Sequence, residues 1–378
     1  MTFHDIPVEW AGLAVLAGFC MMVCLEQSFR ERKRDMLKTR VAAAFRRSVL
    51  ALLAGATVVA GTAVAADDKI KVGALRFTSH SASFIAFEKG YFKEAGLDVE
   101  FVYFQAAAPM AVAIASGDID YGVTAITGGL INLADKDAIK IIGGALHEEE
   151  GIDGSAILVS DAAFKDGVTT PAKLAGRSFG ITQTGSSFHY MAARIAEKEG
   201  IAMDQIALKP LQKVGAIIGA LKSGQIDAWA IVPHIAKALA KGGTVHIIGW
   251  VNDYAPDYQV TTVFTSAENA AEKKDLTKRF LAAFSRGAAD FNAALVDKTA
   301  GEEVAEETVK LIHKYVYTSR PYEKAAPSIR NGAMRLNEGA KLNLSSVQAQ
   351  LDWFKAEGLV KGEIGIDKLV DGSYVETY

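Results

Sequence analysis

The sequence predicts an α/β protein made of two similar lobes, each a mainly parallel sheet flanked by helices. Three observations lead to this prediction. Strand-like and helix-like segments alternate from Lys69 onward. One sequence motif recurs 107 residues later, and two stretches could each connect one lobe to the other. Alternating strands and helices are typical of parallel sheets with crossover helices.

The first lobe begins with a β-α-β-α-β run. Its predicted strands are "KIKVGAL" (Lys69 to Leu75), "LDVEFVYF" (Leu97 to Phe104) and "IDYGVTAI", in which apolar and polar residues alternate or an apolar run is continuous. Between them, "SASFIAFEKGYFKEAG" predicts one helix with Ser81 as its N-cap and Gly96 as its end. "AAPMAVAIASG" predicts a second helix, which ends at Gly117.

Similar motifs then recur further along the sequence, which predicts a second, related lobe. "IASGDIDYGV" is echoed by "LKSGQIDAWA", and this pairs Gly117 with Gly224 and Asp120 with Asp227, both 107 residues apart. "EAGLDVEF" is echoed in turn by "KEGIAMDQIALKP". Echoes at nearly one offset indicate a duplicated unit. The alternative is that junctions between a helix, a glycine and a strand resemble one another without any duplication.

The stretches that could connect the lobes are 143–160 and 246–266, each with two apolar runs around a polar middle. Two crossings imply that the second lobe is inserted into the first, so we expect lobe 1 at 66–156 and 251–378 and lobe 2 at 157–250. Beyond Ser266, "KKDLTKRFLAAFSRGAADFNAAL" and "SSVQAQLDWFKAEGLV" space apolar residues three and four apart. This spacing predicts helices that complete and cover lobe 1.

Residues 36–65 have the pattern of a secretory signal peptide. A basic head, a short apolar run from Ser48 to Ala60 and small residues two apart predict cleavage after Ala65, which would release the protein into the periplasm. A transmembrane anchor is the alternative, although the run is short for one. We expect Met36 to be the true start and 1–35 to be an upstream extension that is not part of the protein; the alternative is a membrane-anchored extension.

Composition excludes several classes of function. The net charge of −3 gives no basic patch for nucleic acid. Cys20 and Cys24 both precede the predicted cleavage point, so the exported chain has no thiolate chemistry, disulfide or Cys-ligated metal. His147 with 148–150 forms an acidic cluster, but adjacent side chains cannot all point one way, so we expect a solvated loop and no metal. We expect no cofactor.

Five motifs together resemble a known family. "EKGYFKEAGLDVEF", "SGDIDYGV", "TGSSFHYMAARIAEKEGI", "SGQIDAWAI" and "DWFKAEGLV" are similar to motifs of the nitrate/sulfonate/taurine periplasmic binding proteins, which are related to the thiamine-pyrimidine-synthase-like group. The resemblance implies a two-lobed periplasmic binding protein fold (type II) with a hinge, and a ligand in the cleft. It also implies a monomer that delivers its ligand to an ABC permease, whose ATPase is a separate chain. Where the family often has Glu-Pro, this sequence has Val232-Pro233.

Ligands of parallel α/β lobes lie beyond the carboxyl ends of the strands, near helix starts. The candidate ligand-binding residues all occupy such positions. They are Arg76, Phe77, Ser79, His80, Gln105, Thr124, Thr127, Thr184, Gly185, Ser186, Ser187, His234 and Trp250. Helix starts favour an anion, and a guanidinium binds a carboxylate or sulfonate. We therefore expect a small organic anion, which could be aromatic because Phe77 and Trp250 can stack on a ring.

Each candidate has an ordinary alternative. Ser186 and Ser187 could simply cap a helix, Arg76 could form a surface or hinge salt bridge, and the histidines could be merely exposed or satisfied in packing. The rival functional class is an enzyme, either an exported hydrolase with a serine nucleophile or a relative of the pyrimidine synthases. The sequence contains no G-x-S-x-G or H-E-x-x-H motif, so a binding protein is the better interpretation.

Overall fold

The computed structural model describes residues 67–378, and the chain from Ala65 to Tyr378 forms one compact unit. The predicted upstream extension, the signal peptide and both cysteines lie outside the described residues. Within residues 67–378, no helix has the length and apolar character needed to cross a membrane.

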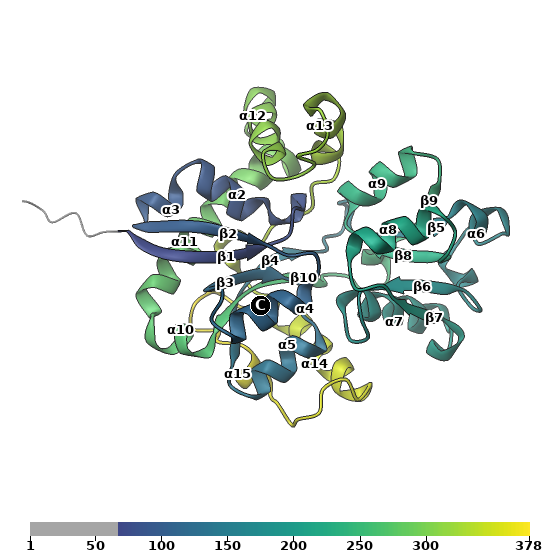
Figure 1. Cartoon of the computed structure of the whole chain (residues 1–378), viewed down its shortest axis with the longest axis horizontal. Coiled ribbons are helices and arrows are strands. Elements are labelled where there is room, and N and C mark those ends of the chain that lie inside the picture. The colour runs from purple at the N-terminus through teal and green to yellow at the C-terminus, as the bar shows by residue number, and fades with distance from the viewer. Residues whose placement is uncertain (1–66) are drawn as a thin grey trace, which may run out of the picture. The chain divides into compact units, whose positions relative to one another are not determined.

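The first sheet has five strands in the order β2-β1-β3-β10-β4 (Figure 1). Strands β1 and β2 pair in parallel, as do β1 and β3, whereas β10 runs antiparallel to both of its neighbours, β3 and β4. The strands are β1 (Asp68–Ala74), β2 (Leu97–Tyr103), β3 (Tyr121–Thr124), β4 (Ile139–His147) and β10 (Gln259–Ser266).

The second sheet repeats this topology in the order β7-β6-β8-β5-β9. Here β6 pairs in parallel with β7 and β8, and β5 runs antiparallel to β8 and β9. The strands are β5 (Ala156–Ser160), β6 (Ser178–Ile181), β7 (Ala207–Pro210), β8 (Ala228–Ile231) and β9 (Val245–Trp250). In each lobe the antiparallel strand is the one that the chain forms directly after crossing from the other lobe.

Helices cover both faces of each sheet (Figure 1). Helix α11 packs against α2 on one face of the first sheet, α4 and α15 pack against α5 on the other face, and α7, α8 and α9 contact the second sheet. The helices are α2 (Ser81–Glu88), α3 (Tyr91–Glu94), α4 (Ala107–Ala115), α5 (Gly128–Asp135), α6 (Asp161–Lys165), α7 (Ser187–Glu199), α8 (Val214–Lys222), α9 (Pro233–Lys241), α10 (Ala267–Glu272), α11 (Lys274–Phe291), α12 (Glu302–His313), α13 (Tyr322–Arg330), α14 (Leu344–Ala356) and α15 (Ile366–Leu369).

One predicted helix is wrong in detail. The segment expected as a single helix ending at Gly96 forms α2 and α3, separated at Gly90, whose φ of +77° breaks the helix. Ser81 is the first residue of α2, and the preceding residue, His80, takes the N-cap position without a side-chain hydrogen bond. The predicted helices after Ser266 are confirmed: α11 packs on lobe 1, and α14 contacts α15.

The two crossing segments, 148–155 and 251–258, are joined to each other. The Glu148 N–H donates to the Tyr258 carbonyl oxygen at 2.9 Å, and the Val251 N–H donates to the Ser155 carbonyl oxygen at 2.7 Å. The Glu148 carboxylate accepts a hydrogen bond from the Ser155 N–H at 3.0 Å, which folds the first crossing onto itself. Burial raises the pKa of Glu148 to about 7. The expected solvated loop is therefore wrong at this residue, which is fully buried.

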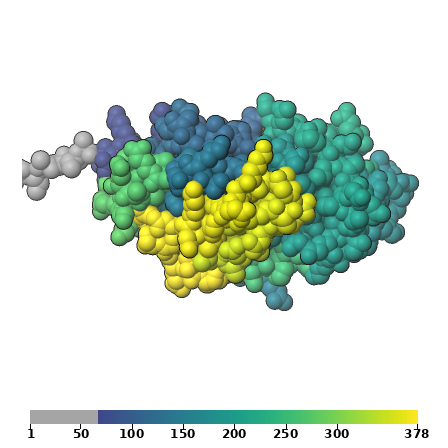
Figure 2. All heavy atoms as spheres, turned by 90° about the horizontal axis from the view of Figure 1, so that it is seen from below, coloured from purple at the N-terminus to yellow at the C-terminus, as the bar shows by residue number. Residues whose placement is uncertain are grey.

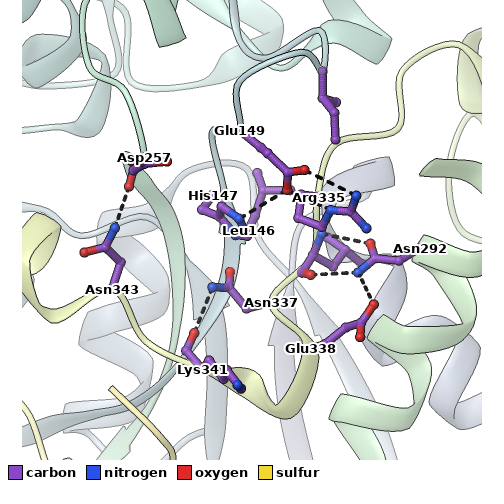
Figure 3. Close-up of polar contacts among 12 residues, drawn as sticks. Leu146, His147, Glu149, Asp257, Asn292, Arg335, Asn337, Glu338, Lys341 and Asn343 are labelled. Atoms are coloured by element: carbon purple, nitrogen blue, oxygen red, sulfur yellow. Dashed lines mark hydrogen bonds and ion pairs between the residues drawn. The ribbon is translucent and has the colours of Figure 1, made fainter. Parts of the chain in front are cut away.

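Polar contacts tie these crossings to the C-terminal part of lobe 1 (Figure 3). The Arg335 guanidinium contacts Glu149 at 2.8 Å and Asp297 at 2.7 Å, and Asn343 donates to the Asp257 carbonyl oxygen at 2.9 Å. In the space-filling view, C-terminal residues (yellow) lie on the surface beside blue residues of lobe 1 and teal residues of lobe 2 (Figure 2). Trp353 of α14 contributes to that contact, with its ring centroid 5.2 Å from that of Tyr190 in α7.

Candidate functional site

A cavity of about 60 Å³ lies between the lobes, and we call it the central cavity. Its lining comes from both lobes: Leu75, Phe77, Ser79, His80, Ala106, Ala107, Thr124, Ala125, Val260 and Thr261 from lobe 1, and Thr182, Ser186, Ser187, Phe188, Met191, Val214, Ile231 and Val232 from lobe 2. None of these side chains is charged. The space suits a small polar group or a few water molecules.

Helix starts surround the central cavity. Ala107 begins α4, Ser187 begins α7 and Val214 begins α8, while His80 and Val232 directly precede α2 and α9. The first N–H groups of a helix have no partner within the helix and form the positive end of its dipole. The cavity is therefore polar in its backbone and largely apolar in its side chains.

Ser186 occupies the N-cap position of α7, but its side chain makes no capping hydrogen bond. Its Oγ is buried and has no hydrogen-bond partner among residues 67–378, and the same is true of Oγ1 of Thr261. A buried hydroxyl without a partner costs free energy. The central cavity has two such hydroxyls, one from each lobe, and a polar group in the cavity could form hydrogen bonds with them. The alternative that the Ser186 side chain merely caps the helix is therefore wrong.

The loop before α7 is shaped by Gly185, whose φ is +76°. Its N–H donates to Nδ1 of His189 at 3.2 Å, so this imidazole supports the loop. Its carbonyl oxygen accepts a hydrogen bond from the Gly128 N–H of lobe 1 at 2.9 Å, across the interface between the lobes. Ser186 has no hydrogen bond to any histidine among the described residues, so no general base is positioned on its hydroxyl.

His80 offers the cavity a neutral donor. The Leu75 N–H donates to His80 Nδ1 at 3.4 Å, so Nδ1 is the acceptor and the ring proton of the neutral form lies on Nε2. Burial lowers the pKa of His80 to about 3, which keeps the ring uncharged at neutral pH. The ring can therefore donate to an acceptor atom of a ligand without adding charge.

His234 lies beside the central cavity, although it does not line it. Its ring is 5.5 Å from Phe77 and 5.9 Å from Tyr317, both of lobe 1, and both ring nitrogens lack a partner among the described residues. Burial, with a smaller effect of nearby His80, lowers its pKa to about 3. The Tyr317 hydroxyl donates to the His234 carbonyl oxygen at 2.9 Å. His234 is thus a contact between the lobes.

Arg76 and Gln105 lie on a neighbouring pocket of about 260 Å³, which we call the Arg76 pocket. Its lining residues are Leu75, Arg76, Phe77, Tyr103, Phe104, Gln105, Val214 and Gly215. The Arg76 guanidinium carbon lies 3.7 Å from the centre of the Tyr103 ring, and Nη1 donates to the Tyr315 carbonyl oxygen at 3.2 Å. Among residues 67–378 Arg76 forms no salt bridge, and its guanidinium lies over an aromatic ring instead.

Three further candidates also lie away from the central cavity. Thr127 caps α5, since its Oγ1 accepts a hydrogen bond from the Leu130 N–H at 3.1 Å. Thr184 is exposed, and Trp250 lies at the end of β9, where the Lys237 ammonium is 5.8 Å from its ring. The remaining candidates that line the cavity are Phe77, Ser79, His80, Thr124, Ser186 and Ser187.

Much of the lining was not among the candidates. Apolar residues such as Met191, Ile231 and Val260 have the pattern of ordinary core residues, so no signal in the sequence marks them. Thr261, like Val260, lies on β10, far along the chain from the lobe 1 lining residues between Leu75 and Ala125. Val232 is the exception, because its departure from Glu-Pro already pointed to this position.

Comparison with known families identifies the chain. The family profile described as NMT1/THI5 like matches residues 77–294, more than half of the sequence. The chain belongs to the NMT1/THI5-like family. The resemblance found in the sequence motifs is thereby confirmed. Within this family member, the matched region includes every cavity residue except Leu75.

Solved structures share the fold of this NMT1/THI5-like chain. The alkanesulfonate-binding protein SsuA from Xanthomonas axonopodis pv. citri, bound to MOPS, is 18% identical, with a TM-score of 0.64 over 82% of this chain and 100% of that one. The nitrate-binding protein NrtA from Synechocystis PCC 6803 is 15% identical, with a TM-score of 0.63 over 80% of this chain and 86% of that one. The fold is that of the two-lobed periplasmic binding proteins, as predicted.

A relative from Brucella abortus (strain 2308), whose name describes it as a binding protein, is 25% identical over 256 residues. The match covers 66% of this chain and 75% of the relative. The relative's name gives no ligand, so the ligand of this chain has to be inferred from its own site.

Proposed function

We propose that the chain is the periplasmic substrate-binding component of an ABC importer, and that it captures a small organic anion, a sulfonate or carboxylate, between its lobes. The observation that carries this proposal is the central cavity, which is lined by the buried hydroxyls of Ser186 and Thr261, one from each lobe, neither with a hydrogen-bond partner among residues 67–378. A ligand that accepts hydrogen bonds from both would also hold the lobes together.

The charge of the ligand follows from the helix starts. Helices α4, α7 and α8 begin at the central cavity, and the positive dipole end at the start of a helix favours negative charge. Because no charged side chain lines the cavity, an anion would meet neither a repelling carboxylate nor a pairing lysine. His80 adds a neutral donor.

The relatives support a role in import. SsuA binds alkanesulfonates and NrtA binds nitrate, according to their names. A structural neighbour from Staphylococcus aureus, 16% identical with a TM-score of 0.63, is the ligand-binding component of an ABC-type import system. The proposal includes a cleaved signal peptide at 36–65 and a monomer in the periplasm whose partner is an ABC permease. Lobe 1 would comprise 66–156 and 251–378, and lobe 2 would comprise 157–250.

Closure of the lobes would couple binding to delivery. The lobes already contact each other where Val214 donates to the Gln105 carbonyl oxygen at 3.4 Å and where Lys237 donates to the Asn331 carbonyl oxygen at 2.7 Å. A ligand that touches both lobes only when they are together shifts the population toward that state. The permease would then recognise the closed form.

Thermal unfolding of the purified protein tests the proposal. The compounds to compare are methanesulfonate, benzenesulfonate, benzoate, nitrate and the uncharged benzyl alcohol. An anion at about a hundred times its dissociation constant should add about 2.7 kcal/mol to the free energy of unfolding. Ser186→Ala should weaken that anion about tenfold without destabilising the fold, because its hydroxyl has no partner to lose.

The matched control is Ser160→Ala. The Ser160 hydroxyl caps α6 by accepting from the Ala163 N–H at 3.2 Å, so its loss should lower the melting temperature and leave affinity unchanged. A response to benzyl alcohol alone would contradict an anionic ligand. No saturable response to any compound would contradict the proposed function.

A further inference from the structure

The central cavity alone does not hold a ligand that has both an anionic group and a body. At about 60 Å³ it accommodates a group of a few non-hydrogen atoms, well below the several hundred Å³ of pockets that enclose whole organic ligands. The Arg76 pocket, of about 260 Å³, lies directly beside it. Leu75, Phe77 and Val214 line both spaces, so the two share an apolar wall.

The Arg76 guanidinium is held in place by an aromatic platform. It lies over the ring of Tyr103 and donates to the carbonyl oxygen of Tyr315. Tyr315 is itself fixed, because its ring stacks on Phe84 at 4.5 Å with an interplanar angle of 6°, and its hydroxyl donates to Glu88 at 2.6 Å. Among residues 67–378 the guanidinium makes this single hydrogen bond, although it carries five N–H groups.

The charges of the two spaces differ. No charged side chain lines the central cavity, whereas Arg76 is the one charged residue on the Arg76 pocket among the residues described. A permanently charged group with free N–H donors suits a carboxylate or another acceptor group. The helix starts suit an anion at the central cavity. The helix starts and Arg76 would therefore each suit an acceptor group, and the apolar residues common to both spaces would suit an apolar body between these groups.

We infer that the ligand is a bifunctional organic acid, with one acidic group in the central cavity and a second acidic or acceptor group at Arg76, joined by a narrow apolar body that passes Phe77 and Val214. This inference rests on the proposed function and specifies its ligand. It makes Arg76 the residue that distinguishes bifunctional acids from simple ones of equal size.

Gly215 provides an independent way to test the Arg76 pocket. It lies in the first turn of α8 and lines that pocket, and a Cβ built on it would have no atom within 4 Å, so a larger side chain fits there without a clash. Gly215→Leu should occupy the pocket and leave the central cavity open. Gly219, in the same helix, is equally unobstructed and lines neither space, so Gly219→Leu is the matched control.

The experiment measures dissociation constants of the full chain for benzenesulfonate and 4-sulfobenzoate, which differ only in the far carboxylate. We expect 4-sulfobenzoate to bind at least about tenfold more tightly than benzenesulfonate, because its carboxylate adds one charge-assisted contact with Arg76. Arg76→Gln should remove that advantage, and Arg76→Lys should restore part of it. Gly215→Leu should weaken 4-sulfobenzoate at least tenfold relative to methanesulfonate, whereas Gly219→Leu should not.

The results separate this inference from the proposed function. Equal affinities for benzenesulfonate and 4-sulfobenzoate, or an advantage that survives Arg76→Gln, would overturn the bifunctional ligand and leave a binding protein for simple anions. Failure of the unmodified protein to bind any of the three sulfonates would overturn the anionic ligand on which the inference rests. Circular dichroism spectra of each variant establish that the comparison is made between folded proteins.

Discussion

Asp120 and Asp227 perform the same structural task in the two lobes. The Asp120 carboxylate accepts a hydrogen bond from the Lys71 N–H at 2.8 Å, and the Asp227 carboxylate accepts one from the Ser178 N–H at 2.8 Å. The two donor residues are 107 residues apart in the sequence, and so are the two aspartates. Each carboxylate fixes the start of its lobe's last parallel strand against the neighbouring central strand, β1 or β6.

Replacing these carboxylates should destabilise the lobes unequally. Asp227 also accepts from the Ser178 hydroxyl at 2.7 Å, so Asp227→Ala should lower the free energy of unfolding by about 2 kcal/mol and Asp120→Ala by about 1 kcal/mol. Urea unfolding followed by circular dichroism measures both values. Equal and negligible losses would show that these bonds only replace bonds to water.

Acid should destabilise the protein through its buried histidines. The pKa of His234 falls to about 3 from an ordinary value of 6.5, so between these pH values the unfolded chain binds more protons than the folded one. The free energy of unfolding therefore falls as the pH is lowered from 6.5, by at most about 1.4 kcal/mol per pH unit for this group. His80 acts in the same direction, since its pKa is also lowered to about 3.

Melting temperatures between pH 4 and 7 test this expectation. His234→Leu should reduce the dependence on pH, because the apolar side chain keeps the packing against Phe77 and cannot be protonated. His313→Leu is the control, since this ring lies at the end of α12 and contacts the Arg320 carbonyl oxygen rather than the interface between the lobes. An unchanged pH profile in the His234 variant would contradict the prediction.

Glu148 should act in the opposite direction, over a pH range that begins near 4.5 and extends to about 7. Its pKa is raised to about 7 from 4.5, so the folded state holds the proton more tightly, and the stabilisation is lost as the pH rises through 7. The free energy of unfolding should fall by about 1 kcal/mol between pH 6.5 and 8. Glu148→Gln should abolish this fall, and Glu149→Gln, which affects a contact of Arg335, should not.

Gly332→Ala should hold the lobes apart. A Cβ on Gly332 of lobe 1 would lie 2.2 Å from both Cα and Cβ of His234 in lobe 2, which is far inside contact distance. We expect a larger radius of gyration by small-angle scattering and at least a tenfold loss of affinity for the bound anion. Gly365→Ala is the control, because its Cβ meets no atom within 4 Å. A variant as compact as the parent would refute this role of Gly332.

The fold could be predicted because its signals are local and repeated. The 107-residue offset of Asp120 and Asp227 follows from the duplication. The break at Gly90 was missed because the apolar spacing continues across it. The burial of Glu148 could not be predicted, since it arises only when the two crossing segments pair.

The site could be predicted less completely, because residues that are adjacent in the sequence can direct their side chains to different places. Arg76 and Phe77 are adjacent in sequence and both line the Arg76 pocket, yet only Phe77 also lines the central cavity, because Arg76 lies over Tyr103. Thr261 reaches the cavity only through the insertion of β10 between β3 and β4, a pairing between segments far apart in the chain. Sequence patterns mark helix starts well, but they do not show which way each side chain turns.

The position of β10 has a consequence for the order in which the chain can acquire its structure during synthesis. Strand β4 leaves the ribosome more than a hundred residues before β10, its neighbour in the sheet, and meanwhile β3 and β4 both lack that partner. Lobe 1 therefore waits for the whole of lobe 2 to be made. An export pathway that delivers the chain unfolded would suit such a protein, because premature folding of its first third would leave two unpaired strand edges.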